Sequence, residues 1–292
     1  MIERIGARAQ ASTPAGLRLD PRLDRVARRV LLGLLVLANL AALVMVLPIA
    51  FQPFSQDWHV LVAGADRIRL GLDPYTNLAS PDGGGFVWSP VAAWLMVPIS
   101  LVGVWGWRAL HVVAALAMPS WRLRLLTLFV FPFWSDVAFG NVTAFALCLA
   151  VWALRGQRWA EVAYLALLCL APKPIFIPVA LWLLWQRPAL RPWFVGIVAL
   201  NALLILAIGF GPQWIEALWH ARTEMANPIN FAPSSLVGAW WVPLSLVLAA
   251  VCFWKRRLGF ASLFVSPYWL PYYLLMPVLD AEPLPDSTTN YG

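Results

Sequence analysis

The 292-residue chain has few charged residues, few cysteines and few histidines. Only 12% of its residues are charged, whereas soluble domains carry about 25%. Its three cysteines and three histidines are scattered, so neither a disulfide framework nor a metal-ligand spacing is visible. The apolar segments also lack the period-2 alternation of an outer-membrane β-barrel. These absences exclude an ordinary soluble globule and a charge-rich disordered chain.

The chain is instead rich in long apolar runs of Leu, Ala, Val and Trp, and 61% of its residues are hydrophobic. Such runs predict an all-α, polytopic integral membrane protein, because a helix satisfies its own backbone hydrogen bonds in lipid. We expect about 9–10 membrane segments, since roughly 20 apolar residues are needed for each span.

The basic residues gather where a membrane protein keeps its cytoplasmic segments. A net charge of +7 would suggest nucleic-acid binding in a soluble protein, but seven of the 21 basic residues precede the first apolar run. Further basic clusters separate later runs, at Arg122/Arg124, Arg155/Arg158, Arg187/Arg191 and Lys255-Arg256-Arg257. The positive-inside rule predicts that these segments are cytoplasmic. We therefore expect membrane lipids, and no nucleic acid, as partners.

The pattern predicts three parts: a basic tail (1–28), a transmembrane domain (29–279) and a polar C-terminal tail (280–292). The first 28 residues are too long and polar for a signal peptide, so the N-terminus is expected in the cytosol and the protein in the plasma (cytoplasmic) membrane. The predicted spans are 30–51, 86–104, 122–138, 140–154, 158–172, 174–185, 192–210, 235–254 and 258–279. Residues 105–119 are interpreted as a half-helix or interfacial helix, because this keeps Arg122 and Arg124 inside.

Two predicted outer loops, 52–85 and 211–234, separate some of these spans. The first contains a possible amphipathic helix over 57–70, with apolar residues near helical spacing. Gly71 and Pro74 are expected to end that helix.

Asp57 is the first candidate for chemistry, because it follows the first span beside Trp58. A partly desolvated aspartate has a raised pKa and can act as a general base. The alternative is structural: aspartate is a favoured N-cap, and an expected helix begins here.

Lys173 is one of only two lysines, and it stands between two prolines in an apolar stretch. A charge at membrane depth is costly, so an anionic ligand such as a lipid phosphate is one explanation. Snorkelling to the interface is the other.

Asn141 follows Gly140 at the outer end of a predicted span. The pair is typical of a turn, but the Asn141 amide is also suited to donate to a sugar or phosphate oxygen. Arg222 and Asn230 belong to the second outer loop and Ser235 directly follows it; these residues form a solvated segment unless that loop folds over a cavity.

Seven short segments, in order across residues 50–270, are similar to the motifs of one known family. They are Asp57-Trp58-His59-Val60, Gly71-Leu72-Asp73-Pro74-Tyr75, Phe86-Val87-Trp88-Ser89-Pro90, Gly140-Asn141-Val142-Thr143, Lys173-Pro174, Asn230 with Ser234-Ser235, and Ser266-Pro267-Tyr268-Trp269. Together they resemble the polyprenol-phosphate-mannose-dependent glycosyltransferases, glycosyltransferase family 87 of the GT-C superfamily. The chain departs from that family in its short length and in having Pro271-Tyr272-Tyr273 where a histidine is expected near Tyr272.

The resemblance implies a GT-C-like helical bundle with an outer-face cavity, a polyprenyl-phosphate sugar donor and Asp57 as the catalytic base. Lys173, with Arg222, is then expected to bind the donor phosphate. The other implied substrate-binding residues are Asp73, Tyr75, Asn141, Asn230 and Ser235. Neither a metal ion nor a cofactor is expected, because Lys and Arg side chains can neutralise a monophosphate leaving group.

The expected activity is transfer of a hexose, with mannose the first choice, to a lipid or glycan acceptor. Two alternatives remain open: a transporter or flippase of a lipid-linked substrate, and an inactive scaffold. Transporters often have internal repeats and ionisable groups near the midplane. Here Asp136 and Glu161 fall near predicted span ends and no repeat is visible, which favours the enzyme.

Overall fold

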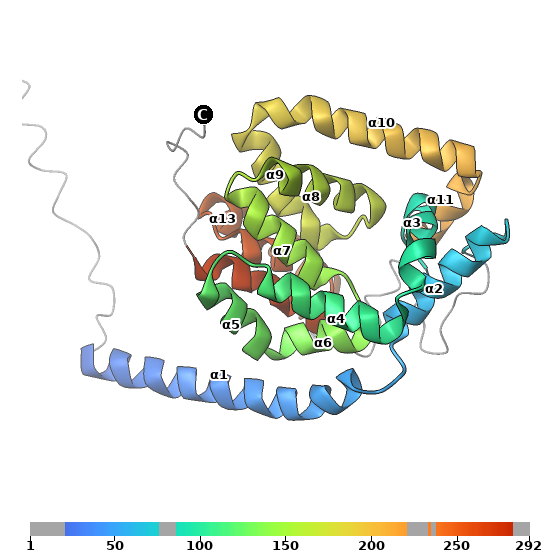
Figure 1. Ribbon diagram of the computed structural model, residues 1–292. Helices are drawn as coiled ribbons and strands as arrows, with labels where there is room; N and C mark the ends of the chain where they lie inside the picture. The colour runs from blue at the N-terminus through green and yellow to red at the C-terminus, as the bar shows by residue number, and fades with distance from the viewer. Residues whose placement is uncertain (1–20, 76–85, 221–232, 235–237, 283–292) are drawn as a thin grey trace, which may run out of the picture. The chain divides into compact units, whose positions relative to one another are not determined.

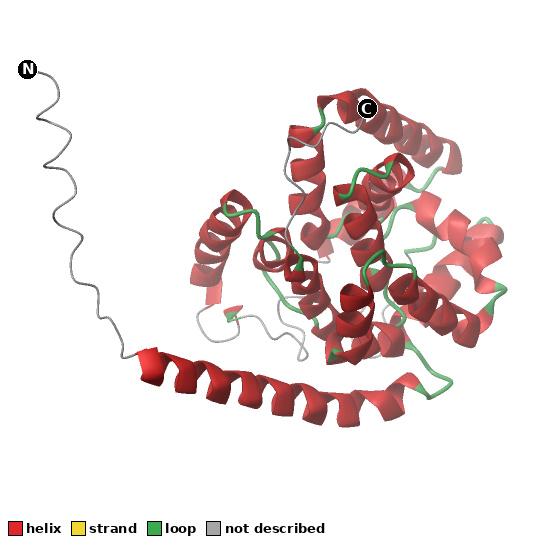
Figure 2. Ribbon diagram, turned by 60° about the vertical axis from the view of Figure 1, so that its left-hand side comes forward, coloured by secondary structure: helices red, strands yellow, loops and turns green. Residues whose placement is uncertain are grey.

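The computed structural model describes residues 21–75, 86–220, 233–234 and 238–282, and these residues form helices and connecting segments without a strand (Figure 2). The chain divides into two compact units, residues 1–44 and 45–292. Helix α1 (Pro21–Ala50) contains an apolar stretch, Val26–Ala50, that is long enough to cross a membrane. The remaining helices belong to the second unit (Figure 1).

Two helices in the described residues are long and apolar enough to cross a membrane, Val26–Ala50 and Pro188–Ile208. A third candidate is a bent pair, α3 (Pro90–Ser100) with α4 (Gly103–Leu116). Shorter apolar helices make up much of the rest. The architecture is therefore all-helical and compatible with a membrane protein, while the predicted number of spans stays a prediction.

Helix α2 (Gln56–Arg69) lies in the first predicted outer loop and packs against α3. Its buried face consists of Trp58, Leu61, Gly64, Ala65 and Ile68. The helix ends at Arg69, with Leu70 as its C-cap, and Gly71 follows with a φ of +71°. That left-handed conformation is routine for glycine and explains the sharp end.

Helices α3 and α4 meet at a bend of 103° instead of forming one continuous rod. The predicted 86–104 span is correspondingly shorter in the structure, because α3 has only 11 residues. Pro90 begins α3, and Ser89 caps it by accepting a hydrogen bond from the backbone of Ala92 (3.2 Å). Proline at the first helical position needs no N–H partner, so it starts this helix without kinking it.

Two other predicted spans are interrupted. The 122–138 segment forms α5 (Trp121–Phe129) and α6 (Phe131–Phe139), with extended backbone at Val130. The 258–279 segment forms a short α14 (Leu258–Phe264) and a 3-10 helix, η5 (Pro271–Ala281). Three prolines (Pro267, Pro271 and Pro277) remove backbone donors there, which explains why one α-helix does not form.

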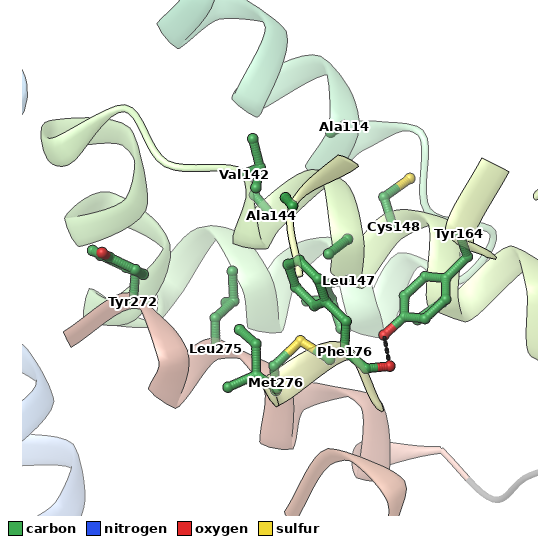
Figure 3. Packing of buried hydrophobic residues seen from close by; sticks show 14 of the residues in the cluster. Ala114, Val142, Ala144, Leu147, Cys148, Tyr164, Phe176, Tyr272, Leu275 and Met276 are labelled. Atoms are coloured by element: carbon green, nitrogen blue, oxygen red, sulfur yellow. Dashed lines mark hydrogen bonds between the residues drawn. The ribbon is translucent and has the colours of Figure 1, made fainter. Parts of the chain in front are cut away.

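The short helix α7 (Thr143–Leu154) lies at the centre of the core, and nine of its residues are buried. It packs against α8 (Arg158–Leu170), α4 and η5. Figure 3 shows Leu147 of α7 beside Phe176, Leu275 and Met276, which come from two other elements. After α8 the chain breaks at Lys173 into η1 (Pro174–Phe176) and α9 (Ile177–Gln186).

The remaining elements complete the second unit. In chain order they are η2 (Pro188–Leu190), α10 (Arg191–Ile208), α11 (Gly211–His220), η4 (Gly238–Trp240) and α13 (Trp241–Trp254).

The C-terminal end of α7 is surrounded by arginines, and we call this region, defined by Arg155, Arg158 and Arg187, the basic end. Arg187 pairs with the buried Glu161 and donates to the carbonyls of Ala153 (3.0 Å) and Leu154 (3.4 Å). These carbonyls belong to the last turn of α7, where a helix has no backbone N–H groups of its own to donate to them.

The turn after α4 lies at the same end of α7, because the Trp152 indole donates to the carbonyl of Ala117 (3.0 Å). The segment that carries Arg122 and Arg124 follows this turn directly.

Candidate site formed by Asp57, Asn141 and Lys173

Asp57 lies in the first turn of α2 and is partly exposed. The N-cap of this helix is Ser55, not Asp57, so the capping interpretation of Asp57 is wrong. The Ser55 side chain is buried and makes no cap hydrogen bond. The carboxylate of Asp57 is therefore available for contacts outside its own helix.

Asn141 joins Asp57 to Lys173. Its Nδ2 donates to the Asp57 carboxylate, and its Oδ1 accepts from Lys173 Nζ (2.7 Å) and from the backbone of Val142 (2.8 Å). The amide orientation follows from these partners, because a lysine ammonium only donates and a carboxylate only accepts. One neutral side chain thus bridges an acid and a cation that are 116 positions apart (173 − 57) in the sequence.

Gly140 allows Asn141 to come this close to α2. Its φ is +74°, and a β-carbon at this position would lie 2.6 Å from Ser55 Oγ and 2.8 Å from Trp58 Cβ. The indole of Trp107 donates to the Gly140 carbonyl (2.9 Å) and stacks on Trp58, with ring centroids 5.2 Å apart. The Gly-Asn turn is therefore packed directly against the helix that carries Asp57.

A buried histidine and a buried aspartate lie next to the backbone of Asn141. His111 Nε2 lies 2.7 Å from the Asn141 carbonyl and 3.5 Å from Asp136, and both of these side chains are fully buried. The Asp136 carboxylate accepts from the backbone of Ala144 (2.7 Å) and Thr143 (3.4 Å). It thereby caps the positive N-terminal end of α7, where a negative charge is favourable.

The segment before α2 is also tied to α4. The buried guanidinium of Arg108 donates to the carbonyls of Gln52 and Phe54, the latter at 3.0 Å. Because Trp107 and His111 of the same helix hold the Gly140–Asn141 turn, α4 contacts both parts of the site.

Three aromatic rings surround the Lys173 ammonium. Its Nζ lies 5.8 Å from the ring centroid of Trp88, 5.5 Å from that of Tyr272 and 5.6 Å from that of Tyr273. Cations within about 6 Å of an aromatic face are attracted to it. The charge of Lys173 is therefore stabilised without being cancelled by the rings.

Tyr272 also contacts Asp57, which connects η5 to the site. Burial raises the pKa of the Asp57 carboxyl above its usual range, while the charge of Lys173 and hydrogen bonds from Asn141 and Tyr272 oppose the rise. A carboxylate with a raised pKa is a stronger base than an ordinary aspartate.

Two other predicted site residues lie beside the site and hold its edge. The Tyr75 hydroxyl donates to the Trp88 carbonyl (2.8 Å), and Asp73 accepts from the Tyr75 backbone (2.9 Å). Arg67 in turn donates to the Asp73 carbonyl (2.6 Å). The structure thus brings Asp57, Asn141 and Lys173 together. Tyr75 is connected to them through Trp88, and Asp73 through Tyr75. Arg222, Asn230 and Ser235 lie outside the described residues.

Sequence reasoning did not select His111, Trp88 or Tyr272 as site residues. The available signals are a histidine within an apolar segment and two tyrosines in the segment where the family resemblance implies a histidine. Neither signal shows which distant residue each side chain contacts.

In the described part of the chain, no group of three or more histidine, cysteine or acidic side chains is arranged to hold a metal ion. Neither a protein-family model, a curated protein nor a solved structure matches the chain.

The arrangement places a carboxylate and an ammonium group on either side of one amide. Asp57 can accept a proton, Lys173 can stabilise negative charge, and Asn141 holds the two groups at a fixed separation. Such a pair suits a reaction in which a hydroxyl loses its proton while an anionic group departs.

Proposed function

We propose that this protein is an inverting membrane glycosyltransferase. It moves a hexose, with mannose the first to test, from a polyprenyl-phosphate donor to a hydroxyl of a lipid or glycan acceptor at the outer face of the membrane. The single observation that carries the proposal is the Asn141 bridge between the Asp57 carboxylate and the Lys173 ammonium. The family resemblance of the motifs supplies the substrate class.

The proposed reaction assigns one task to each charged group. The acceptor oxygen forms a bond to the anomeric carbon, while the bond from that carbon to the phosphate oxygen breaks. The acceptor proton passes to Asp57, and the departing electron pair stays on the phosphate, where Lys173 stabilises it. Attack opposite to the leaving phosphate inverts the anomeric configuration.

The distribution of charge supports an outer-face location. Asn141 precedes the N-terminal end of α7, whereas the basic end surrounds its C-terminal end. Because basic segments favour the cytoplasmic side, the opposite end of α7 is proposed to face outward. A lipid-linked donor then reaches the site from the outer leaflet.

The decisive experiment compares two aspartates of the same helix. Asp57→Asn is expected to reduce hexose transfer from polyprenyl-phosphate mannose by about 10²- to 10⁴-fold, the usual contribution of a general base. Asp66→Asn is the matched control, because Asp66 is exposed and contacts Arg69 on the surface of α2. Radiolabelled transfer in membranes, normalised to the amount of folded protein, gives the rate.

Three outcomes would contradict the proposal. Equal transfer by the wild type and Asp57→Asn removes Asp57 as the base. Movement of the labelled donor across vesicles without transfer identifies a transporter or flippase. Absence of both activities from the wild type, with all donors and acceptors tested, leaves the scaffold.

A further inference from the structure

The segment 86–89 forms hydrogen bonds with three separate parts of the chain. Tyr75 donates to the Trp88 carbonyl (2.8 Å), and Trp214 of α11 donates to the Val87 carbonyl (3.2 Å). The Ser89 backbone donates to the Leu170 carbonyl at the end of α8 (2.9 Å). The backbone on both sides of the Trp88 side chain is therefore fixed, although the segment is not helical.

Trp88 differs in exposure from the other two rings near Lys173. Tyr272 and Tyr273 are 4% and 1% exposed, so their faces are occupied by protein. Trp88 is partly exposed, and Lys173 is partly exposed beside it. Among these three rings, Trp88 is thus the one that offers surface to a ligand whose anionic group contacts Lys173.

We propose that Trp88 is the platform on which the sugar ring of the donor packs while its phosphate contacts Lys173. The inference rests on the proposed function and assigns the sugar subsite within it. A hexose has an apolar face of C–H groups that packs on an indole, and its anomeric phosphate projects from the ring edge. An aromatic surface next to a cation fits this combination of groups.

The competing explanation is that Trp88 only stabilises the Lys173 ammonium. Both explanations predict weaker donor binding when Trp88 is changed, but they differ in which part of the donor matters. A sugar platform affects a ligand that carries a sugar, whereas a support for Lys173 affects every ligand that carries the phosphate.

The experiment therefore compares polyprenyl phosphate with polyprenyl-phosphate mannose as probes of binding to the full-length protein in detergent. Trp88→Leu is expected to weaken binding of the mannosylated lipid about tenfold, a typical loss for one aromatic contact, and to change binding of the bare phosphate less than about twofold. Trp88→Phe keeps a ring and is expected to retain most of the affinity. Trp94→Leu is the matched control, because Trp94 lies on α3 and is 55% exposed.

Each result supports or overturns the inference. Equal weakening for both lipids shows that Trp88 acts through Lys173, and unchanged binding of both shows that it is no platform. If Trp88→Leu does not fold, as judged by thermal unfolding, Trp88→Met, which also lacks a ring, replaces it in the same comparison of the two lipids. If the wild type binds polyprenyl phosphate but gains nothing from the mannose, the sugar subsite fails while the phosphate site stands. If it binds neither lipid, the proposed function fails as a whole.

Discussion

The backbone groups at the two ends of α7 are hydrogen-bonded by side chains of opposite charge. At the N-terminal end, Asp136 accepts hydrogen bonds from the backbone of Thr143 and Ala144. At the C-terminal end, Arg187 donates to the carbonyls of Ala153 and Leu154. Each end thus has the charge that its helix dipole favours.

The ends differ in how their remaining charges are paired. At the basic end, Glu161 pairs directly with Arg187 and lies 3.5 Å from Arg158. At the other end, Asn141 is inserted between Asp57 and Lys173. The buried Glu161 carboxylate therefore contacts a guanidinium directly, whereas the Asp57 carboxylate and the Lys173 ammonium each contact the Asn141 amide. On the proposed function, the basic end serves stability and the end at Asn141 serves binding and chemistry.

After that of Asp57→Asn, the largest expected effect is on activity and comes from Lys173. Replacing this ammonium in Lys173→Met removes the proposed stabilisation of the phosphate, and transfer is expected to fall about 10²- to 10³-fold, as on removal of a donor to a developing charge. The measurement is the initial rate of hexose transfer. Lys255→Met removes the other lysine, which follows α13 at Trp254, and is expected to keep the wild-type rate.

A comparable effect on stability is expected at the basic end. Arg187→Met leaves the buried Glu161 carboxylate with only the longer Arg158 contact, and breaking a buried pair in this way costs about 3 kcal/mol. The free energy of unfolding in a denaturant titration is the measurement, with the exposed Arg191→Met as control. If the loss of stability is small while transfer is abolished, the division of roles between the two ends is wrong.

An intermediate effect is expected at Gly140. An alanine at this position would have to adopt a left-handed backbone conformation, and its β-carbon would collide with Ser55 and Trp58. Strain of this kind lowers the free energy of unfolding by about 1–3 kcal/mol. Gly71→Ala is the matched control, because Gly71 has a φ of +71° with nothing within 4 Å of the added carbon. Thermal unfolding of the two variants separates backbone strain from crowding at the site, and equal losses would show that the close approach of α2 costs nothing.

The smallest expected effect concerns pH dependence and Tyr272. Burial raises the pKa of Asp57 above that of an ordinary aspartate, which is about 3.9. As the pH falls, Asp57 is therefore protonated, and stops acting as a base, at a higher pH than an ordinary aspartate. Tyr272→Phe removes a hydrogen bond that lowers this pKa. The acid limb of the rate profile should therefore move to higher pH.

The plateau rate of Tyr272→Phe is expected to fall by about tenfold or less, because one hydrogen bond contributes about 1 kcal/mol. If the acid limb of the rate profile does not move, Tyr272 does not influence the pKa of Asp57. Tyr268→Phe provides a second tyrosine change in the same region for comparison.

Much of the local structure followed from sequence, but its long-range contacts did not. The break at Lys173 and the helix after Asp57 were both expected, because prolines and apolar spacing are local signals. The interruption at Val130 and the 3-10 conformation of η5 were not expected, since apolar content alone does not distinguish one helix from two. The proximity of Asp57 and Lys173 was expected only through the family resemblance, and their roles stay predictions.

The contributions of His111 and Arg108 were beyond sequence reasoning for a physical reason. Each side chain donates to, or lies against, backbone carbonyls of distant segments. A backbone carbonyl is present at every position, so no residue type marks the partner in advance.

The position of Arg108 on α4 has a consequence for how the site tolerates movement. Side chains of the same helix form hydrogen bonds with the carbonyls of Gln52 and Phe54 and with those of the Gly140–Asn141 turn. A shift of α4 along its axis would therefore carry the acid and the amide together and preserve the gap between them. Arg108→Met removes the contacts with Gln52 and Phe54 and is expected to loosen the segment before α2 from α4.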